Sequence, residues 1–241
     1  MRSELTIIVP VYNEEENLDR LEAELSNYIN IASLPTSVLL VNDGSTDQSL
    51  TKIERICNRN AQFHFISFKT NNGLSTALKA GFDYVTSPLV GYIDADLQTA
   101  PEDFELLLEC IEDYALVTGV RHNRKDTWLK NLSSKVANRV RRLFTNDGME
   151  DTGCPLKVIK TENAKRIPMF RGLHRFLPAM ILLQNGRVKQ VPVRHFPRKA
   201  GTSKYGLGKR LLGPLADCFV YLWMKRKNIN YQIDKSSSDS V

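Results

Sequence analysis

The sequence is poor in cysteine and has no long apolar run. Its four cysteines lie far apart and form neither a CxxC pair nor a Cys/His cluster: Cys57, Cys110, Cys154 and Cys218. This spacing argues against a zinc site and favours reduced thiols over a disulfide framework. No stretch reaches the roughly 18 consecutive apolar residues of a membrane-spanning helix, and no apolar signal segment precedes the first predicted strand. We therefore expect a cytoplasmic protein.

The glycine patterns that cradle phosphate groups are also missing. Neither GxGxxG nor GxxxxGK[ST] occurs, which argues against a dinucleotide-dependent enzyme and a P-loop ATPase. There are no internal repeats, and only the Ser-rich tail, residues 231–241, has the composition of a disordered segment. At 241 residues, the chain is long enough for one α/β domain with a substantial core.

The first half of the chain has few basic residues, and the second half has few acidic ones. Residues 1–113 contain 7 Lys and Arg against 19 Asp and Glu, a net charge of −12. Residues 114–241 contain 26 against 8, a net charge of +18. We expect so basic a half either to contact an anionic partner or simply to be well solvated. A nucleic acid, a nucleotide diphosphate and an acidic lipid headgroup would all fit as the partner.

Apolar runs and amphipathic stretches alternate along the first half. Short apolar runs that end at turn residues predict strands, and stretches with apolar residues three or four apart predict helices. The predicted strands cover residues 5–9, 37–41, 63–68 and 90–93, with a further run at 115–118. The first predicted helix opens at Tyr12–Asn17, with acidic residues in its first turn, and the next two open after Asn42–Asp47 and Asn71–Gly73. This alternation predicts a parallel sheet with helices on both faces.

Polar residues follow each of these predicted strands: Tyr12 and Glu14, Asp43, Asn71, and Asp94 with Asp96. The carboxyl ends of strands are where open α/β sheets bind ligands, so several such loops at one edge predict a nucleotide site. Asp94 and Asp96 supply two hard oxygen ligands, which suit Mg²⁺ or Mn²⁺ shared with phosphate oxygens. Taken alone, Asp-x-Asp also fits a simple turn after a strand.

Together these motifs resemble a family 2 glycosyltransferase of the GT-A fold. The first half carries Thr6–Glu14 (TIIVPVYNE), Val41–Asp47 (VNDGSTD), Asn72-Gly73 and Asp94–Asp96 (DAD). The second half resembles the dolichyl-phosphate mannosyltransferase-like branch through Gly119–Arg121, Asp151–Cys154, His174–Pro178, His195–Arg198 and Ser203–Gly206. The resemblance covers roughly residues 5–210. It implies an α/β fold with a Rossmann-like, mostly parallel sheet, helices on both faces and a C-terminal amphipathic helix.

The resemblance implies an inverting, metal-dependent enzyme. It would move a hexose of mannose or glucose type from a GDP- or UDP-sugar to a polyprenyl phosphate, such as dolichyl or undecaprenyl phosphate. Such an acceptor is already an anion near neutral pH, so it needs positive charge rather than a general base. The Gln-x-x-Arg-Trp motif of processive polysaccharide synthases is absent, which favours the lipid acceptor. The alternative is a family 2 enzyme that glycosylates a glycan hydroxyl in cell-surface polysaccharide synthesis.

The resemblance also assigns residues to the donor site. The nucleoside pocket would be lined by Pro10, Tyr12, Glu14, Val41 and Asp43. Asp94, Ala95 and Asp96 would meet the donor, with Asp94, Asp96 and Gln98 as ligands of Mg²⁺ or Mn²⁺ and Asp96 the more direct one. The donor phosphates would be contacted by Arg121, Arg198 and Lys204. From the residues alone, Asp43 also fits an Asx turn, and Arg198 and Lys204 also fit a solvated basic loop.

Two regions of the second half bear on the acceptor. Residues 127–144 repeat apolar residues at helical spacing between basic ones, and Lys130 and Ser134 match the family positions that hold the acceptor phosphate. A solvated amphipathic surface helix is the alternative. Asp151 would be a catalytic base if the acceptor is a hydroxyl, or else a turn residue. The residues predicted to be catalytic are Asp94, Asp96, Arg121 and Asp151.

We assign residues 1–206 to one catalytic domain, with a nucleotide-binding half (1–113) and a basic acceptor-side half (114–206). Residues 207–230 predict an amphipathic helix in which aromatic residues adjoin a basic cluster, a pattern that suits a lipid headgroup interface. This helix would dock on a membrane surface, on a separate membrane protein or on the catalytic domain. We expect a peripheral protein at the cytoplasmic face of a membrane. Two rival classes are a nucleic-acid-binding protein, for which no recognisable module exists, and a binding subunit without turnover.

Overall fold

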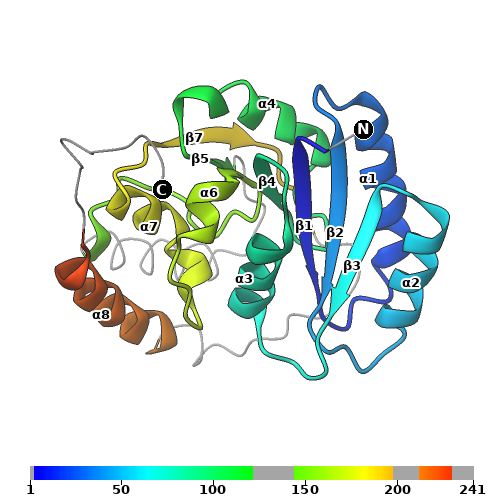
Figure 1. Cartoon of the computed structure of the whole chain (residues 1–241), viewed down its shortest axis with the longest axis horizontal. Helices are drawn as coiled ribbons and strands as arrows, with labels where there is room; N and C mark the ends of the chain where they lie inside the picture. The colour runs from blue at the N-terminus through cyan, green and yellow to red at the C-terminus, as the bar shows by residue number, and fades with distance from the viewer. Residues whose placement is uncertain (1–2, 122–143, 198–211, 230–241) are drawn as a thin grey trace, which may run out of the picture.

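The computed structural model describes residues 3–121, 144–197 and 212–229 (Figure 1). Four of the predicted site residues lie outside this part of the chain: Lys130, Ser134, Arg198 and Lys204. The predicted helix over 127–144 falls almost entirely outside it, and the predicted tail over 231–241 does so completely. No helix within the described ranges is long and apolar enough to cross a membrane.

One sheet of seven strands runs through the described residues, in the order β3-β2-β1-β4-β6-β5-β7. The neighbouring pairs are parallel except where β6 meets β4 and β5. The strands are β1 Leu5–Val11, β2 Thr36–Asn42, β3 Phe63–Ser67, β4 Leu89–Tyr92, β5 Leu116–Arg121, β6 Lys157–Lys160 and β7 Val188–Val193.

Helices cover both faces of this sheet (Figure 1). Those on one face are α1 Leu18–Ile31, α2 Ser49–Arg59 and α4 Phe104–Leu108, and those on the other are α3 Leu74–Tyr84, α6 Thr161–Lys165, α7 Leu177–Leu183 and α8 Leu212–Lys227. Three short 3₁₀ turns complete the described elements: η1 Pro101–Asp103, η2 Ile111–Asp113 and η3 Leu173–Arg175. The predicted fold class, a mostly parallel sheet with helices on both faces and a C-terminal helix, is confirmed.

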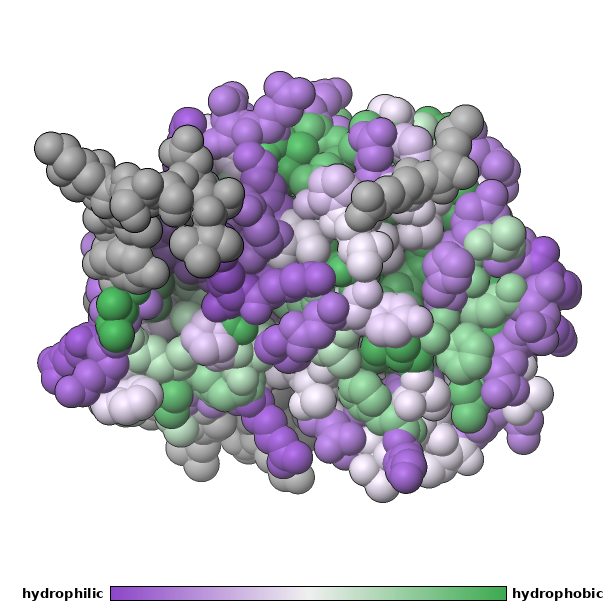
Figure 2. All heavy atoms as spheres, in the orientation of Figure 1, coloured by the Kyte–Doolittle hydropathy of each residue, from purple (hydrophilic) through white to green (hydrophobic). Residues whose placement is uncertain are grey.

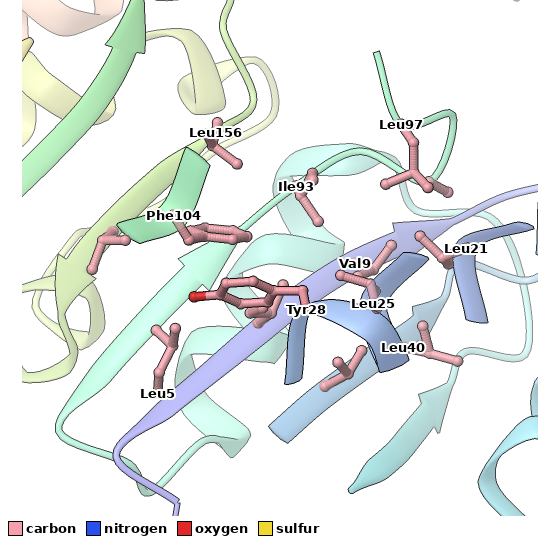
Figure 3. Close-up of a cluster of buried hydrophobic side chains, with 14 of the residues drawn as sticks. Leu5, Val9, Leu21, Leu25, Tyr28, Leu40, Ile93, Leu97, Phe104 and Leu156 are labelled. Atoms are coloured by element: carbon pink, nitrogen blue, oxygen red, sulfur yellow. The ribbon is translucent and has the colours of Figure 1, made fainter. Parts of the chain in front are cut away.

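Successive side chains of each strand point to opposite faces of the sheet, so the buried residues form two cores, one on each face. Ile7 and Val9 of β1 join the cluster beneath α1, α2 and α4, whereas Ile8 joins the cluster beneath α3, α6 and α7. In the first core Tyr28 and Phe104 pack with ring centroids 5.8 Å apart (Figure 3). Because successive side chains of a strand point to opposite faces, a central strand covered on both sides is apolar throughout.

Two details of the fold differ from the sequence prediction. The helix expected to open at Tyr12–Asn17 begins only at Leu18, because Asn13 has a φ of 50° and residues 14–17 form a turn closed by Asn17 N donating to Glu14 O (2.8 Å). Strands β6 and β7 were not predicted. β6 is only four residues long with a lysine at each end, and β7 contains a proline.

Candidate active site

The carboxyl ends of β1, β2 and β4 meet at one edge of the sheet. Pro10 and Val41 are register partners there, and Asp43 N donates to Val11 O (2.8 Å). The strand ends thus place the predicted nucleoside-pocket residues next to one another. Val41 itself is completely buried in the second core and presents no exposed surface.

Asp43 fixes the loop that leads into α3. Its carboxylate accepts hydrogen bonds from the backbone N–H groups of Asn72 (2.7 Å) and Gly73 (2.8 Å) and from the side-chain amide of Asn71 (3.0 Å). Gly44 follows with a φ of 65°, and a Cβ there would lie 2.3 Å from the backbone carbon of Thr70, so this close approach requires glycine. The structure therefore gives Asp43 a loop-ordering role. Its predicted contact with a base or ribose stays a prediction.

The residues after β1 are tied to the loop after β2. Asn13 N donates to Ser45 Oγ (3.0 Å), and Thr46 N donates to Asn13 Oδ1 (2.8 Å). Glu14 N donates to Ser49 Oγ (2.9 Å), and the Glu14 carboxylate accepts from the side-chain amide of Asn17 (2.7 Å). These bonds hold Tyr12 and Glu14 in the same loop cluster as Asp43.

The Asp-x-Asp pair follows β4 directly. Tyr92 donates its hydroxyl proton to Asp94 Oδ1 (2.7 Å), and Gln98 N donates to Asp96 Oδ1 (3.3 Å). Burial raises the pKa of Asp94 to about 6, and the neighbouring charge of Asp96 acts in the same direction. Asp96 is buried and Asp94 is half-buried, and two such carboxylates that repel each other form a donor set that a divalent cation fits.

These carboxylates do not form a complete metal cage. Within the described ranges no group of three or more His, Cys, Asp or Glu side chains is arranged to hold a metal ion. The pair therefore fits a cation that completes its shell with ligand oxygens, as Mg²⁺ does with phosphates. The amide nitrogen of Gln98 donates to Phe196 O (3.4 Å), and its amide oxygen is the atom whose chemistry suits the predicted metal contact.

Arg20 supports this loop from α1 and was not predicted from the sequence. Its Nη2 donates to the carbonyl oxygens of Asp96 (2.7 Å) and Leu97 (3.1 Å). Leu97 has a φ of 47°, a conformation that leucine seldom adopts. A guanidinium reaching across 76 residues of chain leaves no local pattern, so nothing in the sequence near residue 20 indicated it.

The segment after β7 docks on the same loop. Phe196 N donates to Gln98 O (2.8 Å), and His195 Nδ1 lies 3.1 Å from that oxygen. Arg194 binds Asp103 through its backbone N–H and its Nε, both at 2.7 Å. The chain that continues to the predicted phosphate ligand Arg198 therefore leaves from beside the Asp-x-Asp loop.

Arg121 and Asp151 form a bidentate ion pair at the end of β5. Arg121 Nε donates to Asp151 Oδ2 (2.7 Å) and Nη2 donates to Oδ1 (2.8 Å), with both side chains largely buried. Burial alone lowers the pKa of Arg121, but the hydrogen bonds and charge of Asp151 outweigh it and raise that pKa. Both carboxylate oxygens of the predicted base thus accept hydrogen bonds from a guanidinium. The charges of Lys157 and Arg121 also lower the pKa of Asp94, against the effect of burial.

The chain belongs to glycosyl transferase family 2, whose model matches residues 6–167. The protein is therefore a glycosyltransferase with the GT-A fold that the sequence motifs indicated.

Solved structures agree on the fold. The chain is similar to glucosyl-3-phosphoglycerate synthase from Mycobacterium tuberculosis in complex with Mn²⁺, UDP and glucosyl-3-phosphoglycerate, with a TM-score of 0.71 and 13% identity over 95% of this chain and 81% of that one. The same enzyme in complex with phosphoglyceric acid gives a TM-score of 0.70 at 14% identity over the same shares of the two chains. The mannosyltransferase PcManGT from Pyrobaculum calidifontis, in complex with GDP-mannose and Mn²⁺, gives 0.60 at 17% identity over 92% of this chain and 70% of that one.

Proposed function

We propose that this glycosyltransferase is an inverting, metal-dependent enzyme of the dolichyl-phosphate mannosyltransferase-like branch. It moves a mannose- or glucose-type hexose from a GDP- or UDP-sugar to a polyprenyl phosphate. One observation carries the choice of acceptor: both carboxylate oxygens of Asp151, the predicted base, are engaged by Arg121. A guanidinium in this position suits an anionic acceptor, which needs no base.

The donor half of the proposal is supported by the loops at the sheet edge. Pro10, Tyr12, Glu14 and Asp43 lie at adjoining strand ends, where nucleotides bind in open α/β sheets. Asp94 and Asp96, with Gln98, would hold Mg²⁺ or Mn²⁺. When bound, this metal would stabilise the charge that develops on the leaving diphosphate. The similar structures from M. tuberculosis and P. calidifontis contain Mn²⁺ together with UDP and GDP-mannose, respectively, which favours this assignment.

The acceptor half rests on positive charge. Residues 114–241 carry a net charge of +18, enough to bring two phosphate-bearing substrates together. Of the basic residues predicted to contact the donor phosphates, Arg121 is described, and Arg198 and Lys204 lie outside the described residues. Lys130 and the hydroxyl of Ser134, also outside them, are the residues predicted to hold the acceptor phosphate. The acceptor oxygen attacks the anomeric carbon as the bond to the diphosphate breaks, so a single displacement inverts the configuration.

The location we propose is the cytoplasmic face of a membrane. α8 packs on the domain through Cys218 and Tyr221, and the Tyr221 ring stacks on Phe176 with centroids 5.8 Å apart. α8 also exposes Trp223 (63%) and Phe219 (60%) beside the basic end Lys225–Lys227, and the edge-on contact of the Phe219 ring with Phe144 (centroids 5.3 Å apart) leaves most of Phe219 accessible. α8 lies at the left edge of the molecule in Figure 1, where Figure 2 shows hydrophilic and hydrophobic residues side by side. Such a surface suits an anionic lipid interface.

A transfer assay tests the proposal directly. The protein is incubated with Mg²⁺ or Mn²⁺, labelled GDP-mannose or a UDP-hexose, and a short polyprenyl phosphate. We expect labelled lipid with one donor and inversion at its anomeric carbon. Parallel arms contain an oligosaccharide or 3-phosphoglycerate, because the enzyme from M. tuberculosis was solved with phosphoglyceric acid bound. Transfer to a hydroxyl acceptor, with no labelled lipid from any donor, would contradict the lipid acceptor.

Replacing Asp96 by Ala tests the metal site. Asp96 is 5% exposed and lies beside Asp94 at the end of β4. We expect transfer to fall by at least about a hundredfold, the usual cost of losing one group that stabilises developing charge. Asp83→Ala, which removes an exposed carboxylate on α3 paired with Lys79, serves as the control and should leave transfer unchanged. Full activity of the Asp96→Ala variant would remove the metal assignment.

A further inference from the structure

Lys157 is a lysine buried in the centre of the sheet. It is the first residue of β6, where it pairs in register with Tyr92 of β4 and Thr118 of β5. Only 1% of its surface is exposed. An ammonium group in such a place costs several kcal/mol of desolvation unless something compensates it, so a buried lysine calls for a physical reason.

The partners of Lys157 are few. Its Nζ donates to the carbonyl oxygen of Cys154 and lies 5.9 Å from the centre of the Tyr92 ring. Among the residues described, it makes no ion pair within 4.0 Å. Burial lowers its pKa, while the charges of Asp151 and Asp94 oppose that shift. The charge of Arg121 adds to the lowering, and the direct hydrogen bond of the lysine goes to a backbone carbonyl.

That carbonyl belongs to a turn that encloses Arg121. The turn, Asp151–Cys154, begins with the carboxylate that binds Arg121 through two hydrogen bonds. A Cβ placed on Gly153 would lie 3.0 Å from Arg121 Nη2, so the backbone of the turn runs directly against the guanidinium. Cys154, at the other end, is completely buried against Gly119 of β5. The turn thus connects Lys157 at one end with Arg121 at the other.

We infer that Lys157 is a positioning residue. Its hydrogen bond to Cys154 O fixes the turn over residues 151–154, and this turn orients the Arg121 guanidinium toward the substrate phosphates. This inference rests on the proposed function, in which Arg121 contacts a substrate phosphate. It identifies a residue that acts on the reaction without touching a substrate.

Stability alone does not account for a lysine at this position. Replacing Lys157 by an apolar side chain of similar volume removes the desolvation cost of the ammonium group but leaves the Cys154 carbonyl without its hydrogen bond, so the two effects on stability oppose each other. Methionine matches the lysine stem and removes only the ammonium group. A purely structural lysine and a positioning lysine therefore predict different results for Lys157→Met.

The matched control is Lys160→Met. Lys160 lies three residues further along the same strand, and its Nζ also donates to a backbone carbonyl, that of Glu112 (2.9 Å), but this bond is exposed. We expect Lys157→Met to remain folded and to melt within several degrees of the parent protein, because the lost desolvation cost and the lost hydrogen bond oppose each other. Its kcat should fall by about tenfold, because small displacements of a positioned group cost one to two orders of magnitude in rate. Lys160→Met should keep the parent kcat.

Two further readouts report on the link to Arg121. Hydrogen exchange of the amides of residues 151–156 should accelerate in Lys157→Met and not in Lys160→Met. The double variant Lys157→Met/Arg121→Gln should be no slower than Arg121→Gln alone, because a residue that acts through another adds nothing once its target is gone.

Several outcomes would overturn the inference. One is parent-like kcat and exchange in Lys157→Met, and another is a loss of activity that only follows the unfolded fraction. If Lys157→Met does not fold, Gly153→Ala tests the same turn from its exposed side. Its added methyl group should displace Arg121 and lower kcat, and full activity there would also overturn the inference. Failure of the proposed function is distinguishable, because Arg121→Gln itself would then transfer normally.

Discussion

At the scale of single residues, Leu97 combines a backbone conformation that costs energy with a buried side chain. Its φ is 47°, yet the side chain is 5% exposed and packs into the first core (Figure 3). A left-handed conformation at a non-glycine residue costs roughly 1–2 kcal/mol and persists only where its surroundings enforce it. Here the apolar contacts enforce it on one side, and the two hydrogen bonds from Arg20 enforce it on the other. The strained turn sets the positions of Asp94 and Asp96.

Replacing Arg20 by Met should loosen that turn. We expect transfer to fall by about tenfold, because the carboxylates lose their support without being removed. The concentration of Mn²⁺ that gives half-maximal transfer should rise in parallel. A metal titration of initial rates measures both effects.

Arg55→Met is the control for this prediction. Arg55 is an exposed arginine on α2, and it pairs with Asp19 of α1, the helix that carries Arg20. Its replacement should alter neither the rate nor the metal requirement. Equal behaviour of the two variants would show that Arg20 contributes only surface charge.

A functional residue could be predicted from the sequence only where its neighbours along the chain marked its position. Asp43, Asp94 and Asp96 could be predicted because each directly follows an apolar run, so the strand itself points to them. Arg20 and Lys157 could not, because each donates to backbone carbonyls, which carry no side-chain identity. The engagement of Asp151 by Arg121 was equally hidden, since 30 residues separate the two.

At the scale of elements, one partly buried hydrogen-bond cluster joins α3 to η3. Ser75 Oγ accepts from the backbone N–H groups of Gly172 (3.1 Å) and His174 (3.4 Å), so its own proton is directed to His174 Nδ1 (2.9 Å). Burial lowers the pKa of His174 to about 3, and the charges of Arg175 and Lys157 act in the same direction. The folded protein therefore keeps this imidazole neutral.

The pH dependence of stability follows from that difference. Above the unfolded-state pKa of about 6.5, His174 is neutral in both states and has no effect. Below it, the unfolded chain takes up a proton that the folded chain refuses until about pH 3, so folding stability falls as the pH falls. At about pH 5 the loss from His174 is about 2 kcal/mol. His174→Asn keeps an acceptor for Ser75 without titrating, so it should flatten this part of the stability curve.

Urea unfolding at a series of pH values measures the effect. His64→Asn on β3 is the control, because His64 is exposed and its replacement should leave the pH dependence as it was. If the curves of His174→Asn and the parent protein remain parallel down to about pH 5, His174 is not the group responsible.

The elements themselves differed in how well the sequence predicted them. β1 and β2 are buried on both faces and appear as unbroken apolar runs with turn residues after them. β7 is an edge strand whose residues are mostly half-buried, and Pro192 within it argues against a strand. β6 gains its place only from pairing with β4 and β5, which no local pattern records.

At the scale of the whole molecule, the exposed aromatic residues of α8 and the basic second half of the chain predict binding to anionic membranes. The protein should sediment with vesicles that contain an anionic phospholipid and much less with phosphatidylcholine alone. Raising the salt concentration should weaken this binding, because charges at the surface are screened. Phe219→Ser/Trp223→Ser should weaken it by about tenfold or more, since burying each ring contributes on the order of 1.5 kcal/mol.

Tyr84→Ser provides the control for vesicle binding. Tyr84 is a similarly exposed aromatic residue (60%), but it lies at the end of α3 without a basic cluster beside it. Its replacement should leave sedimentation unchanged. If the double variant at Phe219 and Trp223 sediments like the parent protein, α8 is not the membrane contact.

The reversed direction of β6 has a consequence for how such enzymes can vary. β6 is antiparallel to β5, so the chain leaves the sheet at Arg121 and returns through Asp151 at the same edge. The ion pair between Arg121 and Asp151 joins the two ends of the segment that lies between them. The intervening residues 122–150 can therefore differ in length or be exchanged between relatives while both anchor points and the sheet register stay as they are. A chimaera that receives this segment from another family member should keep its donor and adopt a different acceptor.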